Sequence, residues 1–100
     1  MRLIVLVTLK DGVSHEQYQA WAKSTDLPTV RALPSIAGFD LFRATGLLGG
    51  GKAPCDYIEI IDIGDMEAFG SDVARPEMQA IAAQFAAFAD TIFITTEPVA

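Results

Sequence analysis

Residues 3–18, LIVLVTLKDGVSHEQY, place an apolar strand directly before a helix and decide the fold class. Leu3–Leu9 is an almost unbroken apolar, β-rich run, which is typical of a strand covered on both faces. A polar turn follows it. Ser14 and Gln17 then have the spacing of a capping box, so a helix is predicted to begin near His15.

The first helix is predicted to be amphipathic and to be interrupted. Tyr18 and Trp21 recur at helical spacing and belong to its inner face. Pro28 lacks an amide hydrogen and biases Leu27 away from helical backbone, so a break is expected there. A further helical turn is predicted over Thr29–Leu33.

The rest of the chain adds strands and one long helix. Three further strands are predicted over Phe39–Thr45, Tyr57–Ile63 and Thr91–Glu97. A short helical stretch is expected over Asp65–Phe69, and a long helix from Pro76 with an apolar stripe at 78, 81, 82, 85 and 88. The order βαββαβ predicts a ferredoxin-like α+β fold, a four-stranded antiparallel sheet with helices on one face.

The composition narrows the function classes. The chain has 100 residues, 51% of them hydrophobic, so a single domain over 1–100 is expected. A formal charge of −6 with seven basic residues argues against partners such as nucleic acid or anionic membranes. A lone cysteine, Cys55, and a lone histidine exclude an internal disulfide and a two-histidine metal site within the chain. We expect a cytoplasmic protein with no metal or other cofactor.

The sheet face away from the helices predicts a partner. The strand sequences carry apolar residues on both faces, more than a solvated face would carry. An apolar sheet face of this kind needs a cover, and a second copy is the simplest one. The sequence therefore predicts a homodimer packed sheet to sheet.

The glycine-rich segment Gly46–Pro54 contains a partial phosphate-binding pattern. GLLGGGK matches the spacing of a P-loop, but Ala53 stands where that loop needs a hydroxyl, and a strand follows where it needs a helix. A mobile hairpin loop is the preferred interpretation. Cys55 has no neighbouring cation in the sequence, so it is not predicted to be a nucleophile.

Several side chains are candidates for acid–base chemistry. His15 is the only imidazole and could act as a base, or lie in solvent in the first helical turn. Asp26 could act as a base or cap the next helical turn. Tyr57 could donate a phenolic proton or a hydrogen bond. These are the candidate catalytic residues.

Other side chains are candidates for substrate binding. If the hairpin turns near Gly50, Arg43 lies directly opposite Glu59, either as a cross-strand ion pair or as a buried polar pair in a cavity. Arg31 could hold an oxyanion. Trp21 is expected in the core and is also a candidate for contact with a substrate.

The sequence resembles the dimeric α/β-barrel superfamily and, within it, the REDY-like HapK family, named after a protein of a prodigiosin-type pigment cluster. The resemblance rests on the element order and on YQAWAKSTDLPTVR (18–31), FDLFRATG (39–46) and DYIE (56–59). It implies a homodimer, with a pocket for a small, often aromatic molecule between the sheet and the helices. Members of the superfamily include cofactor-free monooxygenases, polyketide cyclases and isomerases.

The chain departs from the related EthD-like pattern at one position. That pattern has a histidine near the end of the first helix, and Asp26 stands there in this chain, between Trp21 and Pro28. The resemblance therefore does not imply histidine chemistry here, although Asp26 could act as a base in the same place. Heme is not expected, because His15 at a helix start is poorly placed as an axial ligand.

Three functions follow from these observations. The first is a cofactor-free enzyme of secondary metabolism that abstracts a proton beside a carbonyl, as a cyclase, isomerase or monooxygenase would. The second is a ligand-binding or accessory protein without turnover. The third is a structural dimerisation module, which predicts no cavity of the size that ligands need.

Overall fold

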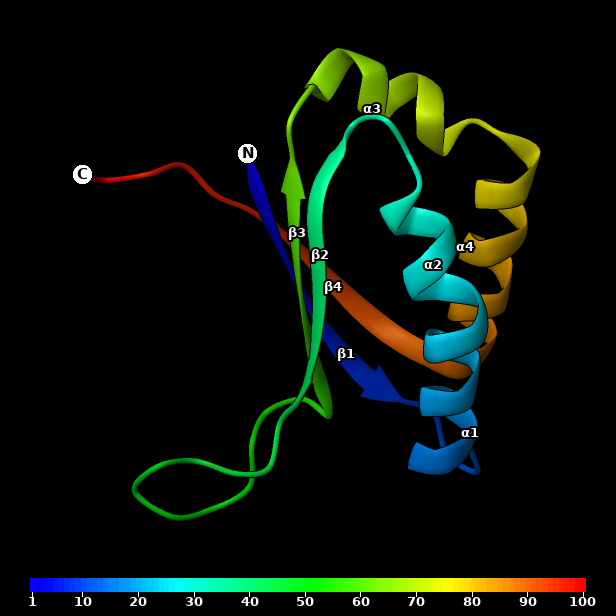
Figure 1. The fold of residues 1–100 in the computed structure, drawn as a ribbon. Helices are drawn as coiled ribbons and strands as arrows, with labels where there is room; N and C mark the ends of the chain where they lie inside the picture. Colours follow the sequence, from blue (N-terminus) through cyan, green and yellow to red (C-terminus); the bar gives the residue numbers. More distant parts are fainter.

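The computed structural model describes residues 1–100, and its elements follow the predicted order (Figure 1). The strands are β1 (Arg2–Leu9), β2 (Ile36–Arg43), β3 (Tyr57–Ile63) and β4 (Ala89–Thr95). The helices are α1 (His15–Trp21), a π-helical turn η1 (Ala22–Asp26), α2 (Leu27–Arg31), α3 (Met66–Val73) and α4 (Pro76–Phe88).

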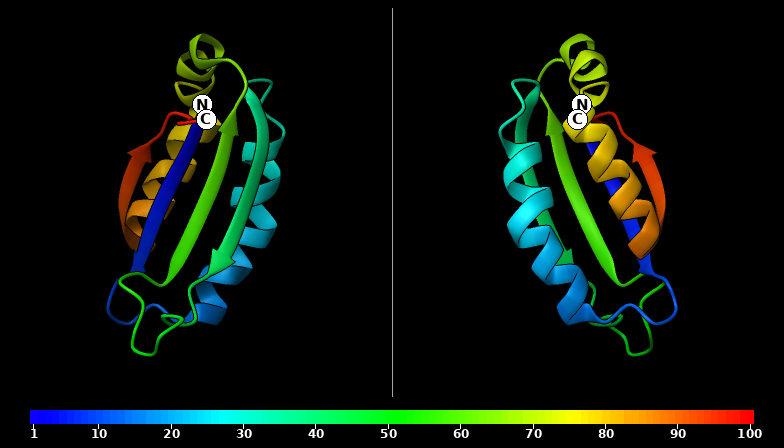
Figure 2. Two further views of the ribbon diagram at one scale, coloured as in Figure 1. Left: turned by 90° about the vertical axis from the view of Figure 1, so that its left-hand side faces the viewer. Right: turned by 90° about the vertical axis from the view of Figure 1, so that its right-hand side faces the viewer.

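The strands form one sheet in the order β2-β3-β1-β4, and every neighbouring pair is antiparallel. The helices lie on one face: α1 and α2 run behind the β2 side and α4 behind the β4 side (Figure 2). This is the ferredoxin-like arrangement that the sequence predicted. β3 has the predicted bounds, whereas β2 begins at Ile36 instead of Phe39 and ends before Thr45.

The start of the first helix is confirmed. Ser14 is the N-cap of α1, and its hydroxyl accepts a hydrogen bond of 3.0 Å from the Gln17 amide. The expected break before Pro28 is wrong in detail, because Leu27 has helical backbone angles of φ −58° and ψ −52°. The π-helical turn η1 accommodates Pro28 without a break, because the Leu27 amide donates to the Ala22 carbonyl five residues before it.

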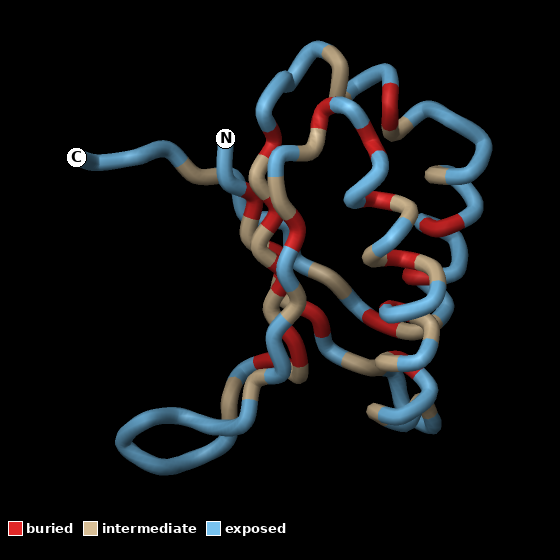
Figure 3. Tube along the Cα trace, viewed as in Figure 1, coloured by how far each residue is buried: buried red, intermediate tan, exposed pale blue.

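The core lies between the sheet and the helices (Figure 3). Odd-numbered positions of β1 and β3 face it, so Val5 and Val7 are fully buried beside Tyr57. Four aromatic side chains join the helices α1 and α4 above the sheet, with ring centroids of neighbouring pairs 5.3–6.5 Å apart: Tyr18, Trp21, Phe85 and Phe88. Their packing fixes α1 against α4.

The opposite face of the sheet carries no helix, and its centre is apolar, with charged side chains such as Arg2, Asp40 and Asp62 toward its edges. Strand alternation and the observed registers place side chains from all four strands on it. Phe42, Ile92 and Ile94 are between 40% and 61% exposed there. The remaining apolar members are Ile4, Leu6, Ile58 and Ile60. We call these seven residues the open sheet face.

The glycine-rich segment is a loop, as predicted, and it projects on the side of the open sheet face (Figure 1). Its tip is a tight turn in which the Gly50 amide donates to the Leu47 carbonyl at 2.9 Å. Gly50 and Gly51 adopt φ values of 100° and 107°, which side chains disfavour, so glycine is required by the turn. No helix begins at this loop, and the P-loop interpretation is excluded.

Candidate functional site

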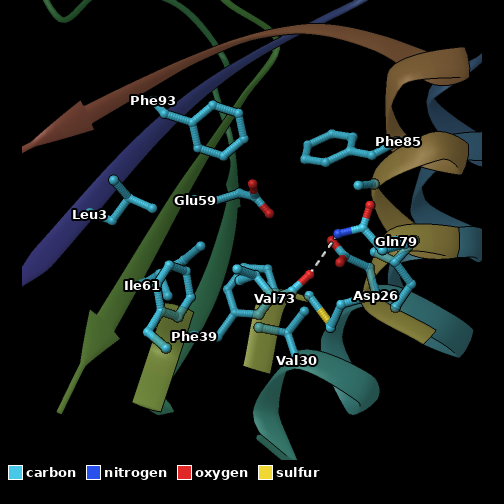
Figure 4. A pocket seen from close by; sticks show the side chains of 14 residues that line it. Leu3, Asp26, Val30, Phe39, Glu59, Ile61, Val73, Gln79, Phe85 and Phe93 are labelled. Atoms are coloured by element: carbon cyan, nitrogen blue, oxygen red, sulfur yellow. Dashed lines mark hydrogen bonds between the residues drawn. The ribbon is translucent and has the colours of Figure 1, made fainter. Parts of the chain in front are cut away.

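An apolar cavity of about 270 Å³ lies between the sheet and the helices (Figure 4). Every strand contributes to its wall, together with η1, α2, α3 and α4. Eleven of its 14 lining residues are hydrophobic; the three polar ones are Asp26, Glu59 and Gln79. An acidic side chain that faces this cavity is therefore poorly hydrated.

The π-helical turn brings Asp26 to this cavity. Tyr18, Ala22, Asp26 and Val30 are all buried, and they recur at every fourth position. A regular helix advances about 100° per residue, so such a series would drift around it. The wider turn of η1 offsets that drift and holds Asp26 toward the sheet, where it is only 3% exposed.

Asp26 has an unusual environment for a carboxyl group. Its Oδ2 atom is buried and has no hydrogen-bond partner. Burial raises the pKa of Asp26 to about 6, because the charged form loses its water. The carboxyl group is therefore mostly ionised at neutral pH and able to accept a proton.

Glu59 faces the same cavity from the middle of β3. Its position follows from alternation, because Tyr57, Glu59, Ile61 and Ile63 all point toward the helices and are buried. Glu59 is 2% exposed. Burial, and then the negative charge of Asp26, raise the pKa of Glu59 to about 8. At neutral pH the two carboxyl groups therefore hold about one proton between them.

Neither carboxyl group has a counter-charge. The chain contains four ion pairs, and none includes Asp26 or Glu59. Residues with raised carboxyl pKa values in a cleft are candidates for acid–base chemistry. We call Asp26 and Glu59 the buried acid pair.

Tyr18 adds a second buried group without a hydrogen-bond partner beside the pair. Its hydroxyl is buried and has no hydrogen-bond partner. Burial, Glu59 and Asp26, in that order, raise the pKa of Tyr18 well above its usual value. The hydroxyl thus stays neutral near the two acids.

Removing that hydroxyl is expected to stabilise the fold. A buried hydroxyl without a partner loses its hydration and gains nothing, so Tyr18→Phe should raise the free energy of unfolding by about 1 kcal/mol. Urea denaturation of the two proteins measures the difference. A loss of stability would show that the hydroxyl has a partner in solution.

A separate polar cluster surrounds Tyr57. The Tyr57 hydroxyl lies 2.8 Å from His15 Nδ1 and accepts a hydrogen bond of 3.0 Å from Gln19 Nε2. The Tyr57 ring packs on Tyr18, with centroids 4.7 Å apart. The fold thus brings two predicted catalytic residues, His15 and Tyr57, into contact with each other, but outside the cavity of the buried acid pair.

The predicted substrate-binding residues are dispersed. The predicted register is wrong: Arg43 pairs with Tyr57, and Glu59 pairs with Leu41. Arg43 is exposed and forms no ion pair with Glu59. The two-residue difference keeps both side chains on one face, but it leaves Glu59 in the cavity and Arg43 at the end of the sheet.

Arg31 and Trp21 also lie outside the cavity. Arg31 Nε donates to the Phe39 carbonyl at 2.9 Å, and its guanidinium group lies 3.8 Å from Asp40. Trp21 Nε1 donates to Gln84 Oε1 at 2.7 Å and joins α1 to α4. Both therefore have structural contacts in this fold.

Asp26 does not cap a helix. Although it precedes α2, its side chain makes no capping hydrogen bond, which corrects that alternative. Sequence reasoning missed the contribution of α3 to the cavity, and with it Phe69 and Val73. It also missed the role of the Tyr18 hydroxyl, since helical spacing alone assigned Tyr18 to the core.

The structure offers no metal site of ordinary composition. No three histidine, cysteine or acidic side chains are grouped so that they could hold a metal ion. None of the helices is long and apolar enough to cross a membrane.

The fold and the cavity define a ferredoxin-like protein with a small-molecule-sized pocket between its sheet and helices. The sequence profile of the REDY-like protein HapK family matches residues 1–99, so the chain belongs to that family. No match was found among curated proteins.

Solved structures share this fold. HapK from Hahella chejuensis is 25% identical over 100% of this chain and 96% of its own, with a TM-score of 0.74. SnoaB from Streptomyces nogalater, a cofactor-independent oxygenase crystallised as a point mutant, is 17% identical over 98% and 93%, with a TM-score of 0.72. A dimeric ferredoxin-like protein of unknown function from Thermobifida fusca is 22% identical over 93% and 85%, with a TM-score of 0.70.

Proposed function

We propose that the protein binds a small, largely apolar molecule in this cavity and acts on it as a cofactor-free enzyme, by proton transfer beside a carbonyl group. The observation that carries the proposal is the buried acid pair, two carboxyl groups in an apolar cavity with no counter-charge. Burial of two unpaired carboxyl groups destabilises the fold, and destabilising groups of this kind are concentrated at functional sites.

The two acids have complementary roles in the proposed reaction. Asp26, the more acidic, is the base and takes a proton from the carbon next to the carbonyl. The electron pair of that C–H bond moves toward the carbonyl oxygen. Glu59, which is protonated at neutral pH, donates a hydrogen bond to that oxygen, keeps its proton and stabilises the enolate. Return of the proton from Asp26 to another carbon of the enolate completes an isomerisation. In a cyclisation, the enolate carbon attacks a second carbonyl carbon of the same molecule, and Asp26 gives its proton to the oxygen of that carbonyl.

Exchange of carbon-bound hydrogen tests the proposed chemistry without knowledge of the natural substrate. The probe is 2-tetralone, an apolar bicyclic ketone, whose deuterium uptake from D₂O is followed by NMR. We expect wild-type protein to accelerate the exchange, and Asp26→Asn to remove at least about 100-fold of that acceleration. Asp40→Asn is the matched control, because it replaces an exposed carboxyl group outside the cavity.

The other outcomes separate the alternatives. Binding of the ketone without accelerated exchange would favour a ligand-binding or accessory protein without turnover. Exchange that survives Asp26→Asn would remove Asp26 from the mechanism. The purely structural function predicted a filled interior, and the cavity of about 270 Å³ argues against it.

The proposal includes a homodimer in which two open sheet faces pack together. It is supported by the exposed apolar residues of that face and by the dimeric ferredoxin-like protein of the same fold. We also place the protein in secondary metabolism, which its membership of the HapK family supports. The cofactor-independent oxygenase SnoaB, which has the same fold, supports chemistry without a cofactor. The cytoplasmic location expected from the unpaired Cys55 is part of the same proposal.

A further inference from the structure

The polar groups of the cavity are almost all hydrogen-bond acceptors. No lysine, arginine or histidine lines it. The Gln79 amide nitrogen is engaged, since Nε2 donates to the Val73 carbonyl at 2.9 Å, which leaves the Gln79 amide oxygen as an acceptor. Asp26 Oδ2 is buried and lacks any donor from the protein. A ligand that satisfies this wall must bring positive charge or N–H donors with it.

The aromatic side chains that line the cavity also favour a positively charged ligand. Phe39, Phe69, Phe85 and Phe93 all line the cavity. The Glu59 side chain points into the same cavity as the rings of Phe85 and Phe93 (Figure 4). Ring faces carry negative electrostatic potential and attract organic cations, whereas carboxylates and phosphates gain nothing from them.

We propose that the ligand is an apolar organic cation, a protonated amine on an aromatic or aliphatic body. The Asp26 carboxylate supplies the charge. The carbonyl oxygen of the Glu59 carboxyl group and the ring faces supply the remaining contacts. The inference rests on the proposed small-molecule cavity and goes beyond it by stating the charge of the ligand. Together, the two proposals describe the substrate as an amino-substituted carbonyl compound.

Three probes with one body and different end groups test the inference. Phenylbutylamine, phenylbutanol and phenylbutyrate share the phenyl ring and the carbon chain, and they present a cation, a neutral hydroxyl and an anion. Isothermal titration calorimetry of the full chain at neutral pH measures each affinity. We expect the amine to bind at least about tenfold more tightly than the alcohol, and the carboxylate to bind most weakly.

Matched variants assign the preference to the buried acid pair. Asp26→Asn keeps the shape of the side chain and is expected to abolish the preference for the amine while it retains binding of the alcohol. Asp26→Leu is the second variant, in case Asp26→Asn does not fold, because it removes the carboxylate without leaving a buried amide unpaired, and it should abolish the same preference. Asp40→Asn removes an exposed charge and should leave the ratio unchanged.

Each remaining outcome has a distinct meaning. If the alcohol binds as well as the amine, the inferred charge of the ligand is wrong while the cavity remains a binding site. If the amine preference survives in both Asp26→Asn and Asp26→Leu, it arises elsewhere on this acidic protein, and the inference fails. If no probe binds, the small-molecule cavity of the proposed function fails with it.

Discussion

Wild-type protein is expected to lose roughly 5 kcal/mol of its free energy of unfolding between about pH 5 and pH 8, and Glu59→Gln should remove most of that loss. Burial, and then Asp26, raise the pKa of Glu59 from its ordinary 4.5 to about 8. In that range the folded chain retains a proton that the unfolded chain has released. Stability is therefore fully present below the unfolded pKa and falls as the pH rises through the folded one.

Asp26 contributes in the same direction over a narrower range, because burial raises its pKa from 3.8 to about 6. Asp26→Asn should accordingly remove a smaller part of the loss. Urea denaturation at a fixed protein concentration, repeated across this pH range, measures both effects. The comparison uses the slope of the free energy of unfolding against pH. The absolute values are not compared, because the buried Asn or Gln amide of each variant lacks a partner and shifts the stability at every pH.

Asp62→Asn is the control for these measurements. Arg2 donates a hydrogen bond to Asp62 and lowers the pKa of this exposed carboxyl group. Any effect of Asp62 on the pH dependence therefore lies below about pH 4. The variant should keep the wild-type slope above about pH 5. If the free energy of unfolding of the wild-type protein does not change with pH, the buried acid pair is hydrated in solution and its carboxyl groups do not have raised pKa values.

The second large effect is expected on the stability of the proposed dimer. Ile92 lies on the open sheet face, opposite Leu6, and is 61% exposed in the single chain. Ile92→Asp should thus leave the folded chain intact, but it places a carboxylate where the proposed dimer buries apolar surface. Burial of an unpaired charge costs several kcal/mol, so the dimer should weaken by at least about 100-fold.

Sedimentation velocity over a dilution series measures that change. Ala83→Asp, on an exposed position of α4, adds the same charge to the helical layer and should leave the dimer unaffected. Circular dichroism checks that both variants are folded. An Ile92→Asp protein that stays dimeric would place the interface on another surface, and a monomeric wild type would remove the sheet-to-sheet dimer from the proposed function.

The sequence predicted the fold well because the signals are local. Hydrophobic periodicity separated the strands from the helices, and the capping pattern at Ser14 located the start of α1. Alternation along Tyr57–Ile63 placed Glu59 on the same face as Tyr57, and the structure shows that this face is the buried one. The fold class was thus accessible from the sequence alone. Asp26 and Glu59 were accessible as separate candidates, but the sequence placed Glu59 with Arg43 and not with Asp26.

The parts that failed depend on longer-range geometry. The pairing of Arg43 depends on the length and shape of the glycine-rich loop, and residue types alone do not define that path. The helical conformation of Leu27 before Pro28 depends on a π-helical turn that has no simple sequence signal. The cavity itself arises where α3 and α4 stand away from the sheet, which only the tertiary structure shows.

The π-helical turn has an evolutionary consequence. In an uninterrupted α-helix, side chains eight positions apart point about 80° away from each other, so Tyr18 and Asp26 would not both face the sheet. The extra backbone width of η1 aligns them. Loss of a single codon within this turn would place the two side chains seven positions apart, and on a regular α-helix they would then differ by only about 20° and share a face. The turn therefore corresponds to a one-residue insertion that the helix accommodates, and such an insertion or deletion leaves the carboxyl group of this pocket facing the interior.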